Sequence, residues 1–195
     1  MSDPVTYSFY GTTVPVLRSI ASSAIGILTS AKNERSNAAA DTILPSDKEM
    51  LDSQFGDMLP LRMQPIILAT FALSGIGKLQ LNGSTPIPAM NPAEISSFDD
   101  VIALFKQVLA VLDAIDEKTY NEHAEKSVDI AVGDKTLHMT GFADYTHGFI
   151  IPNSYFHLNA IYMLLRAKGF KLGKTLYIHS WMSEQQKKDW APLKA

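Results

Sequence analysis

The spacing of apolar residues is the feature that most constrains how this chain can fold. In four long stretches, apolar side chains recur at steps of three and four residues, which is the period of an α-helix with one buried face. These stretches cover residues 5–31, 60–81, 97–115 and 141–168. Between residues 127 and 140 the period changes to two around Gly133 and Asp134, which predicts a β-hairpin. The pattern therefore predicts a mainly all-α fold, an up-and-down four-helix bundle with a small hairpin inserted before the last long helix.

Individual residues indicate where these helices begin, bend or end. The spacing of Ser46 and Glu49 predicts a capping box at the start of a short helix over residues 47–54. Pro65 either kinks the second long helix or marks its true start. Thr140 is expected to cap the last helix, and a glycine at position 169 is expected to end it.

Length and composition exclude several classes of protein. A chain of 195 residues suits one domain, so residues 1–195 are treated as a single unit. The net charge of -3 is spread along the sequence and gives no basic surface for nucleic acid. Cysteine is absent, which rules out disulfides and thiolate nucleophiles. The first residues do not resemble a secretory signal, and no apolar run approaches the length of about 20 residues that a bilayer requires. We therefore expect a cytoplasmic protein without a membrane or nucleic-acid partner.

Three sequence blocks carry a resemblance to a known family. They are GDMLPLRMQ at residues 56–64, SFDD at the start of the third helix, and PNSYFHLNAIYMLLRAKGFKLGK at residues 152–174. Together with the strand-turn-strand before the last helix, they resemble DUF1993, a family of unknown function within the DinB/YfiT-like helical superfamily. The resemblance covers residues 5–178 and implies the helical-bundle fold, but it implies no particular reaction.

The resemblance also bears on metal binding. DinB-like proteins commonly hold a divalent metal through three histidines, two spaced HxxxH on the last helix and one on the second. Here His157 matches the first position of the pair, but Ile161 occupies the second, and residues 60–81 contain no histidine. Because a catalytic zinc needs about three protein ligands, we expect no metal and no other cofactor. A metal-dependent DinB-like transferase or hydrolase remains an alternative function.

The candidate site surrounds His157 on the core face of the last helix. Asn153 lies one turn before it, Pro152 removes a backbone amide, and Gln64 precedes Pro65 on the second helix. Two helices opened by proline, each with an amide side chain nearby, predict a polar-based pocket. In this hypothesis His157 is the acid/base group, Gln64 and Asn153 hold a carbonyl or hydroxyl, and a tyrosine donates a further hydrogen bond. The tyrosines are Tyr155 and Tyr162, and the remaining substrate-binding residues are Met63, Pro152 and Ile161.

Two functions follow from opposite interpretations of His157. If it exchanges protons, the protein is a cofactor-independent enzyme of the isomerase or lyase type, acting on a small apolar oxygenated molecule by isomerisation, dehydration or cyclisation. If it is a core histidine bonded to Asn153 or to a side chain of the second helix, the protein is a non-catalytic ligand-binding or dimerisation module. The aromatic tail, residues 175–195, is expected to pack on the bundle or on a second subunit of a possible homodimer.

Overall fold

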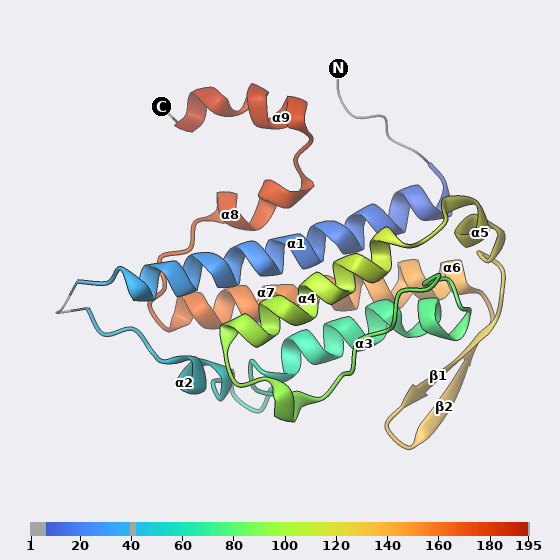
Figure 1. The fold of residues 1–195 in the computed structure, drawn as a ribbon, viewed down its shortest axis with the longest axis horizontal. Helices are drawn as coiled ribbons and strands as arrows, with labels where there is room; N and C mark the ends of the chain where they lie inside the picture. Colours follow the sequence, from blue (N-terminus) through green and yellow to red (C-terminus); the bar gives the residue numbers. More distant parts are fainter. Residues whose placement is uncertain (1–6, 40–41, 195) are drawn as a thin grey trace.

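Four long helices form an elongated bundle in the computed structural model, which describes residues 7–39 and 42–194 (Figure 1). They are α1 (Phe9–Ser36), α3 (Met63–Lys78), α4 (Phe98–Asp113) and α7 (Ile151–Ala167). The helix α1 packs against α4 and α7, and α3 packs against the same two helices from the other side. This arrangement confirms the predicted mainly helical bundle.

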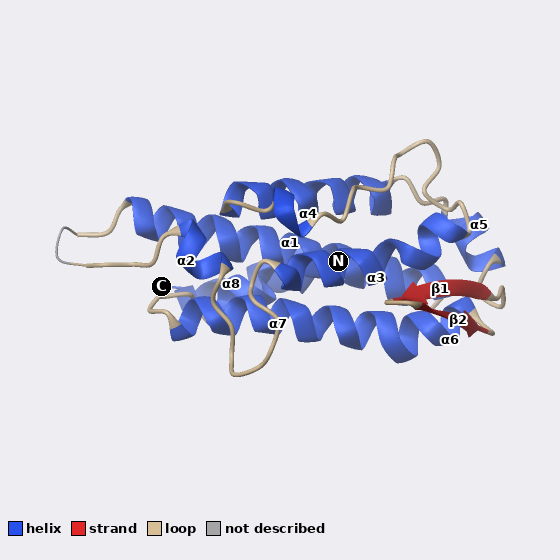
Figure 2. Ribbon diagram, turned by 90° about the horizontal axis from the view of Figure 1, so that it is seen from below, coloured by secondary structure: helices blue, strands red, loops and turns tan. Residues whose placement is uncertain are grey.

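Short elements connect and extend the long helices. The short α-helices are α2 (Asp47–Leu51), α5 (Glu117–Glu122), α6 (Phe142–Tyr145), α8 (Lys174–Ile178) and α9 (Glu184–Asp189). Short 3₁₀-helices cover Pro92–Glu94, His179–Trp181 and Ala191–Lys194, and a π-helical turn covers Thr146–Ile150. The predicted hairpin is present as β1 (Val128–Val132) and β2 (Lys135–Met139), antiparallel and closed at a Gly133 of positive φ. Figure 2 shows it at the end of the bundle opposite the connection between α1 and α2.

The second long helix begins three residues after the predicted Pro60, and the structure decides the place of Pro65. Ser46 and Glu49 form the capping box of α2. The helix α3 begins at Met63, so Pro65 lies in its first turn, where a missing N–H removes no helical hydrogen bond. Pro65 therefore marks the start of the helix and does not kink it.

The first helix is longer at its C-terminal end than the pattern predicts. It runs to Ser36 because its last turn is tied to two other helices. Lys32 pairs with Asp99 of α4 at 2.7 Å, and Arg35 pairs with Asp47 of α2 at 2.5 Å. The predicted start at residue 5 lies outside the described residues, and the described helix begins at Phe9 with Ser8 as its N-cap.

The last helix begins differently from the prediction. Thr140 does not cap it; Gly141 occupies the N-cap position without a side-chain bond. The first helical amides are instead satisfied by the segment before the hairpin, since the N–H groups of Phe142 and Ala143 each donate to a carbonyl there at 2.8 Å. A π-turn then joins α6 to α7, with the Ile151 N–H bonded to the Thr146 carbonyl. The helix ends before Gly169, whose φ of +98° is the expected left-handed stop.

The C-terminal segment lies along the outside of the bundle. The Ser23 hydroxyl donates to the Tyr177 carbonyl at 2.8 Å, and the hydroxyls of Ser19 and Ser180 each donate to the other's backbone carbonyl at 3.0 and 2.8 Å. These bonds fix residues 174–181 on α1, and Figure 1 shows α9 extending beyond them.

The helix α1 is more apolar than expected, since the sequence predicted no apolar run long enough to cross a bilayer. Its 28 residues include a window of mean hydropathy 1.4, which by length and composition alone could cross a bilayer. Half of that window is buried inside the bundle, as in the core helix of a water-exposed fold, so the finding is weak support for a membrane span.

Candidate functional site

His157 and Gln64 form a buried hydrogen-bonded pair that joins α7 to α3. The His157 Nδ1 lies 2.7 Å from the Gln64 Oε1, and the Gln64 Nε2 donates to the Leu59 carbonyl at 2.6 Å. Because the amide nitrogen of Gln64 is used as a donor, its oxygen is the acceptor and His157 Nδ1 carries the hydrogen. The side chains are only 7% and 2% exposed. The pair therefore fixes both the orientation and the tautomer of the imidazole.

Burial also fixes the charge of this imidazole. Desolvation lowers the pKa of His157 from its ordinary 6.5 to about 4, because the charged form loses its hydration. At neutral pH the ring is uncharged and a weak base. Its Nε2 makes no hydrogen bond to the part of the chain that the structure describes. The ring is therefore neutral, and both its orientation and its tautomer are fixed. Such a ring suits a polar contact between two core helices.

Only some of the predicted site residues lie near this pair. Met63, adjacent to Gln64, is half-buried, and Ile161 is fully buried one turn after His157. Asn153 lies one turn before His157, with its Nδ2 buried and unpaired. Pro152 is exposed after the π-turn. His157, Gln64 and Ile161 thus belong to one packed layer of the core.

The predicted tyrosines belong to a different contact. Tyr155 stacks on Trp181 with ring centroids 5.9 Å apart. The Tyr162 hydroxyl donates to the Leu172 carbonyl at 3.0 Å, and its ring meets Tyr177 edge-on at 5.5 Å. Both rings therefore hold the C-terminal segment on α7, and the structure does not bring them to His157.

A groove beside α3 was not anticipated from the sequence. We call it the α3 groove; it has a volume of about 440 Å³ and lies between α3, the loop before α4 and strand β1. Its lining is Thr70, Phe71, Leu73, Ser74, Gly77, Lys78, Ile87, Met90, Ile130 and Ala131. Six of these side chains are apolar, and three carry a hydroxyl or an amine. The groove therefore combines an apolar wall with a few polar groups.

Local sequence explains why this groove forms. The chain reverses after α3 through Gln80, at a φ of 55°, and the proline-rich loop returns alongside the helix. Gly77 lets that loop approach, since a Cβ there would lie 3.2 Å from the Ile87 side chain. On the other side, Ile130 of β1 is buried against α3. The high content of Pro and Gly in residues 75–92 was the available sequence signal.

The polar groups of the α3 groove are available for a ligand. The Ser74 hydroxyl donates to the Phe71 carbonyl at 2.9 Å, which leaves its oxygen free to accept. Lys78 is exposed and forms no ion pair with any residue that the structure describes. The groove thus offers one free cation and two hydroxyl side chains beside apolar walls.

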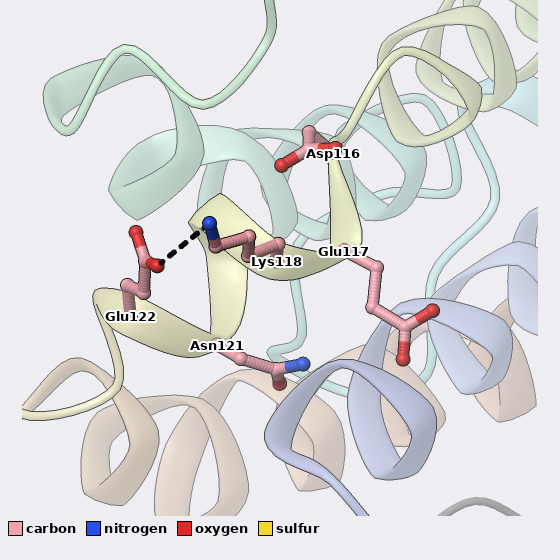
Figure 3. Close-up of a pocket in the computed structure, with 5 residues that line it drawn as sticks. All are labelled: Asp116, Glu117, Lys118, Asn121 and Glu122. Atoms are coloured by element: carbon pink, nitrogen blue, oxygen red, sulfur yellow. Dashed lines mark ion pairs between the residues drawn. The ribbon is translucent and has the colours of Figure 1, made fainter.

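A second hollow lies on α5 and is polar (Figure 3). Its lining residues are Asp116, Glu117, Lys118, Asn121 and Glu122. Asn121 accepts from the Tyr10 N–H at 2.8 Å, and Asp116 caps the helix by accepting from the Thr119 N–H. Lys118 and Glu122 form an exposed pair at 3.9 Å, of the kind that contributes little. These contacts hold α5 in place, and we assign the hollow no ligand.

Metal-ligating side chains do not gather within residues 7–39 and 42–194. No group of three His, Cys, Asp or Glu residues has a geometry that could hold a metal ion there. We predict that purified protein carries no stoichiometric transition metal and gains no thermal stability from zinc or nickel, because a ligand of the folded state would raise its stability. Elemental analysis and thermal unfolding with each metal test this. About one metal ion per chain, lost on His157→Gln, would contradict the prediction.

The helical bundle with its hairpin matches a known fold and a known family. The fold resembles the crystal structure of a DinB family member from Shewanella denitrificans, with a TM-score of 0.67, 23% sequence identity, and coverage of 87% of this chain and 90% of that one. At this identity the likeness concerns the fold alone. The chain belongs to the family described as a domain of unknown function, DUF1993, whose model matches residues 9–178. A comparison with curated proteins found no match.

Proposed function

We propose that this protein is a non-catalytic module that binds a small apolar molecule carrying a carboxylate. The proposal rests on the α3 groove, where apolar walls lie beside Lys78, which forms no ion pair with the described residues. Its volume of about 440 Å³ lies within the range of small-molecule sites, about 300–1,000 Å³. The apolar walls favour the body of such a ligand, because burial removes apolar surface from water.

The polar groups of the groove favour one orientation of that ligand. Lys78 ends α3 and lines the groove, so an anionic group of the ligand can pair with its ammonium. The apolar part then extends towards Ile87 and Met90. A carboxylate suits this site better than an amine, since the described lining contains no acidic residue.

The proton-transfer enzyme remains the alternative function. It is favoured by one observation, the oriented imidazole of His157 with an Nε2 that is not hydrogen-bonded to the described chain. Two observations weigh against it. The pKa of His157 is lowered to about 4, far from the value that suits a general base near neutrality. In addition, His157 does not line the α3 groove, which contains the free lysine.

The binding proposal predicts a charge-specific loss of affinity in Lys78→Met. Methionine keeps most of the apolar stem and removes the cation. We expect about 2–5-fold weaker binding of medium-chain carboxylates such as decanoate, because exposed ion pairs contribute up to about 1 kcal/mol. Binding of the matching alcohol, decanol, should change little. Isothermal titration of both ligands measures the two effects.

Two further variants separate the groove from the rest of the surface. Lys106→Met removes an exposed lysine on α4 and should leave decanoate binding unchanged. Ala131→Trp, in the wall of the groove, should weaken binding of both acid and alcohol by filling the space. If the parent protein binds neither ligand, or if Ala131→Trp binds both as the parent does, the groove is not the site.

A further inference from the structure

The segment that follows the hairpin packs against α3 beside the α3 groove. It consists of α6 and the π-turn Thr146–Ile150, and it meets α3 at two points. The Phe142 ring occupies the space that a Cβ at Gly75 would fill, so α6 lies directly on the helix backbone. One turn earlier on α3, the rings of Phe71 and Phe149 meet edge-on at 5.0 Å. The two contacts set this segment antiparallel to α3.

Tyr145 lies between these two contacts, immediately before the π-turn. Its side chain is buried, at 5% exposure, and its hydroxyl makes no hydrogen bond to any residue that the structure describes. Burial raises the pKa of Tyr145, and the adjacent side chain of Ser74 opposes that rise. Ser74 is also one of the residues that line the α3 groove. The phenol of Tyr145 is therefore an unpaired hydroxyl group next to a hydroxyl group of the groove.

The Ser74 hydroxyl can change its hydrogen-bond partner at small cost. Its hydrogen is directed to the Phe71 carbonyl at 2.9 Å. That carbonyl lies inside α3, where the N–H group four residues further on also binds it, so the serine supplies only a second bond to the same acceptor. A hydroxyl hydrogen rotates about its C–O bond to suit its surroundings. Ser74 can therefore turn its hydrogen towards a ligand in the groove, and its oxygen can accept from Tyr145.

The stability of the free protein does not explain a tyrosine at position 145. A buried hydroxyl without a partner lowers stability, and phenylalanine would fill the same space without that cost. Side chains that break a local rule in this way are expected at functional sites, and π-turns are frequent there as well. The position of Tyr145, before a π-turn and beside a residue of the groove, agrees with both expectations.

We infer that Tyr145 is a positioning residue of the α3 groove, which acts through Ser74 and favours a carboxylate over an alcohol. The inference rests on the proposed binding function. With a carboxylate bound at Lys78, Tyr145 donates to the Ser74 oxygen, and Ser74 donates to a carboxylate oxygen. Each hydroxyl in such a chain polarises the next and strengthens the bond to the anion. An alcohol does not need the chain, because it can donate to the Ser74 oxygen while the serine hydrogen stays on Phe71.

The first test is isothermal titration of Tyr145→Phe with decanoate and with decanol. We expect decanoate to bind about 2–5-fold more weakly than to the parent, the effect of one lost hydrogen bond, and decanol to bind unchanged. Thermal unfolding should show a variant no less stable than the parent, because the hydroxyl removed is unpaired among the described residues. Tyr162→Phe is the matched control. It removes a tyrosine hydroxyl that bonds the Leu172 carbonyl, away from the groove, and should bind decanoate as the parent does.

A double-mutant cycle tests whether Tyr145 acts through Ser74. Ser74→Ala should weaken decanoate binding by about 2–10-fold, and adding Tyr145→Phe should weaken it no further, because the phenol has lost the group through which it acts. Decanoate binding by Tyr145→Phe that equals the parent's overturns the inference and leaves the groove as the site. So does an equal loss for decanol, or a full additional loss in the double variant. A parent that binds neither ligand rejects the proposed function, and the inference with it.

Discussion

Acidification from pH 7 to pH 4 is expected to lower the free energy of unfolding by about 3 kcal/mol through His157 alone. The ordinary pKa of this group is 6.5, and burial lowers it to about 4 in the folded protein. Between these values the unfolded chain binds a proton that the folded chain excludes, so stability rises with pH across the window. The contribution is complete above pH 6.5 and is lost as the pH falls towards about 4. Denaturant unfolding at a series of pH values measures it.

The variant His157→Gln isolates this contribution. Glutamine does not titrate, so the stability of the variant should vary much less between pH 6.5 and 4. Several carboxylates also have a lowered pKa, chiefly through hydrogen bonds, as for Asp100 with Ser96 and Ser97. Their contribution is present above the unfolded pKa of a carboxyl and is lost at lower pH, and both proteins share it. A variant that loses stability as steeply as the parent above pH 4 would show that His157 is not the group responsible.

Local signals in the sequence predicted the helices well because their causes lie within a few residues. The apolar stripe on α4 is buried as its spacing indicates, with Val101, Phe105 and Leu112 at or near zero exposure. Its start at Ser97 is fixed by a capping box with Asp100. The turn of the hairpin likewise has a local cause, Gly133, whose φ is +61°. The family resemblance is confirmed over nearly the same range, residues 9–178.

Features that depend on distant segments were missed. Thr140 failed as a cap because carbonyl groups before the hairpin occupy the amides it would have bound. Tyr155 and Tyr162 of α7 contact the C-terminal segment instead of His157, because the chain after the bundle places Trp181 and Leu172 next to them. The period of a helix gives the side on which a residue lies, but the neighbour that covers that side is set by packing.

The candidate site was predicted in part. That His157 and a side chain of the second helix could meet was foreseen, and the partner is Gln64. The space for a ligand was expected beside them, at the two prolines. Pro65 lies in the first turn of α3, so it does not disrupt the helix or create a pocket there. Pro152 follows a π-turn and is exposed. The α3 groove arises instead from a loop and a strand that approach α3 from elsewhere in the chain, which no short motif encodes.

The largest expected effect separates the binding module from the enzyme. In a proton-transfer enzyme, His157→Gln should reduce turnover by about 10²–10⁴-fold, because glutamine cannot exchange a proton. In the module that we propose, His157 joins α3 to α7, and the same variant should bind decanoate as the parent does. Glutamine can still donate to Gln64, so its free energy of unfolding at pH 7 should fall by no more than about 1–2 kcal/mol.

His157→Leu completes this comparison, because it removes the hydrogen-bond donor as well as the proton exchange. Gln64 then keeps a buried oxygen without a partner, which is expected to cost about 1–3 kcal/mol, more than His157→Gln does. A structural role requires this order of stabilities, with decanoate binding following the folded fraction in both variants. Denaturant unfolding and product analysis after incubation with each bound ligand test the two functions together. Consumption of a ligand by the parent, abolished in a stably folded His157→Gln protein, would reject the module and support catalysis by His157.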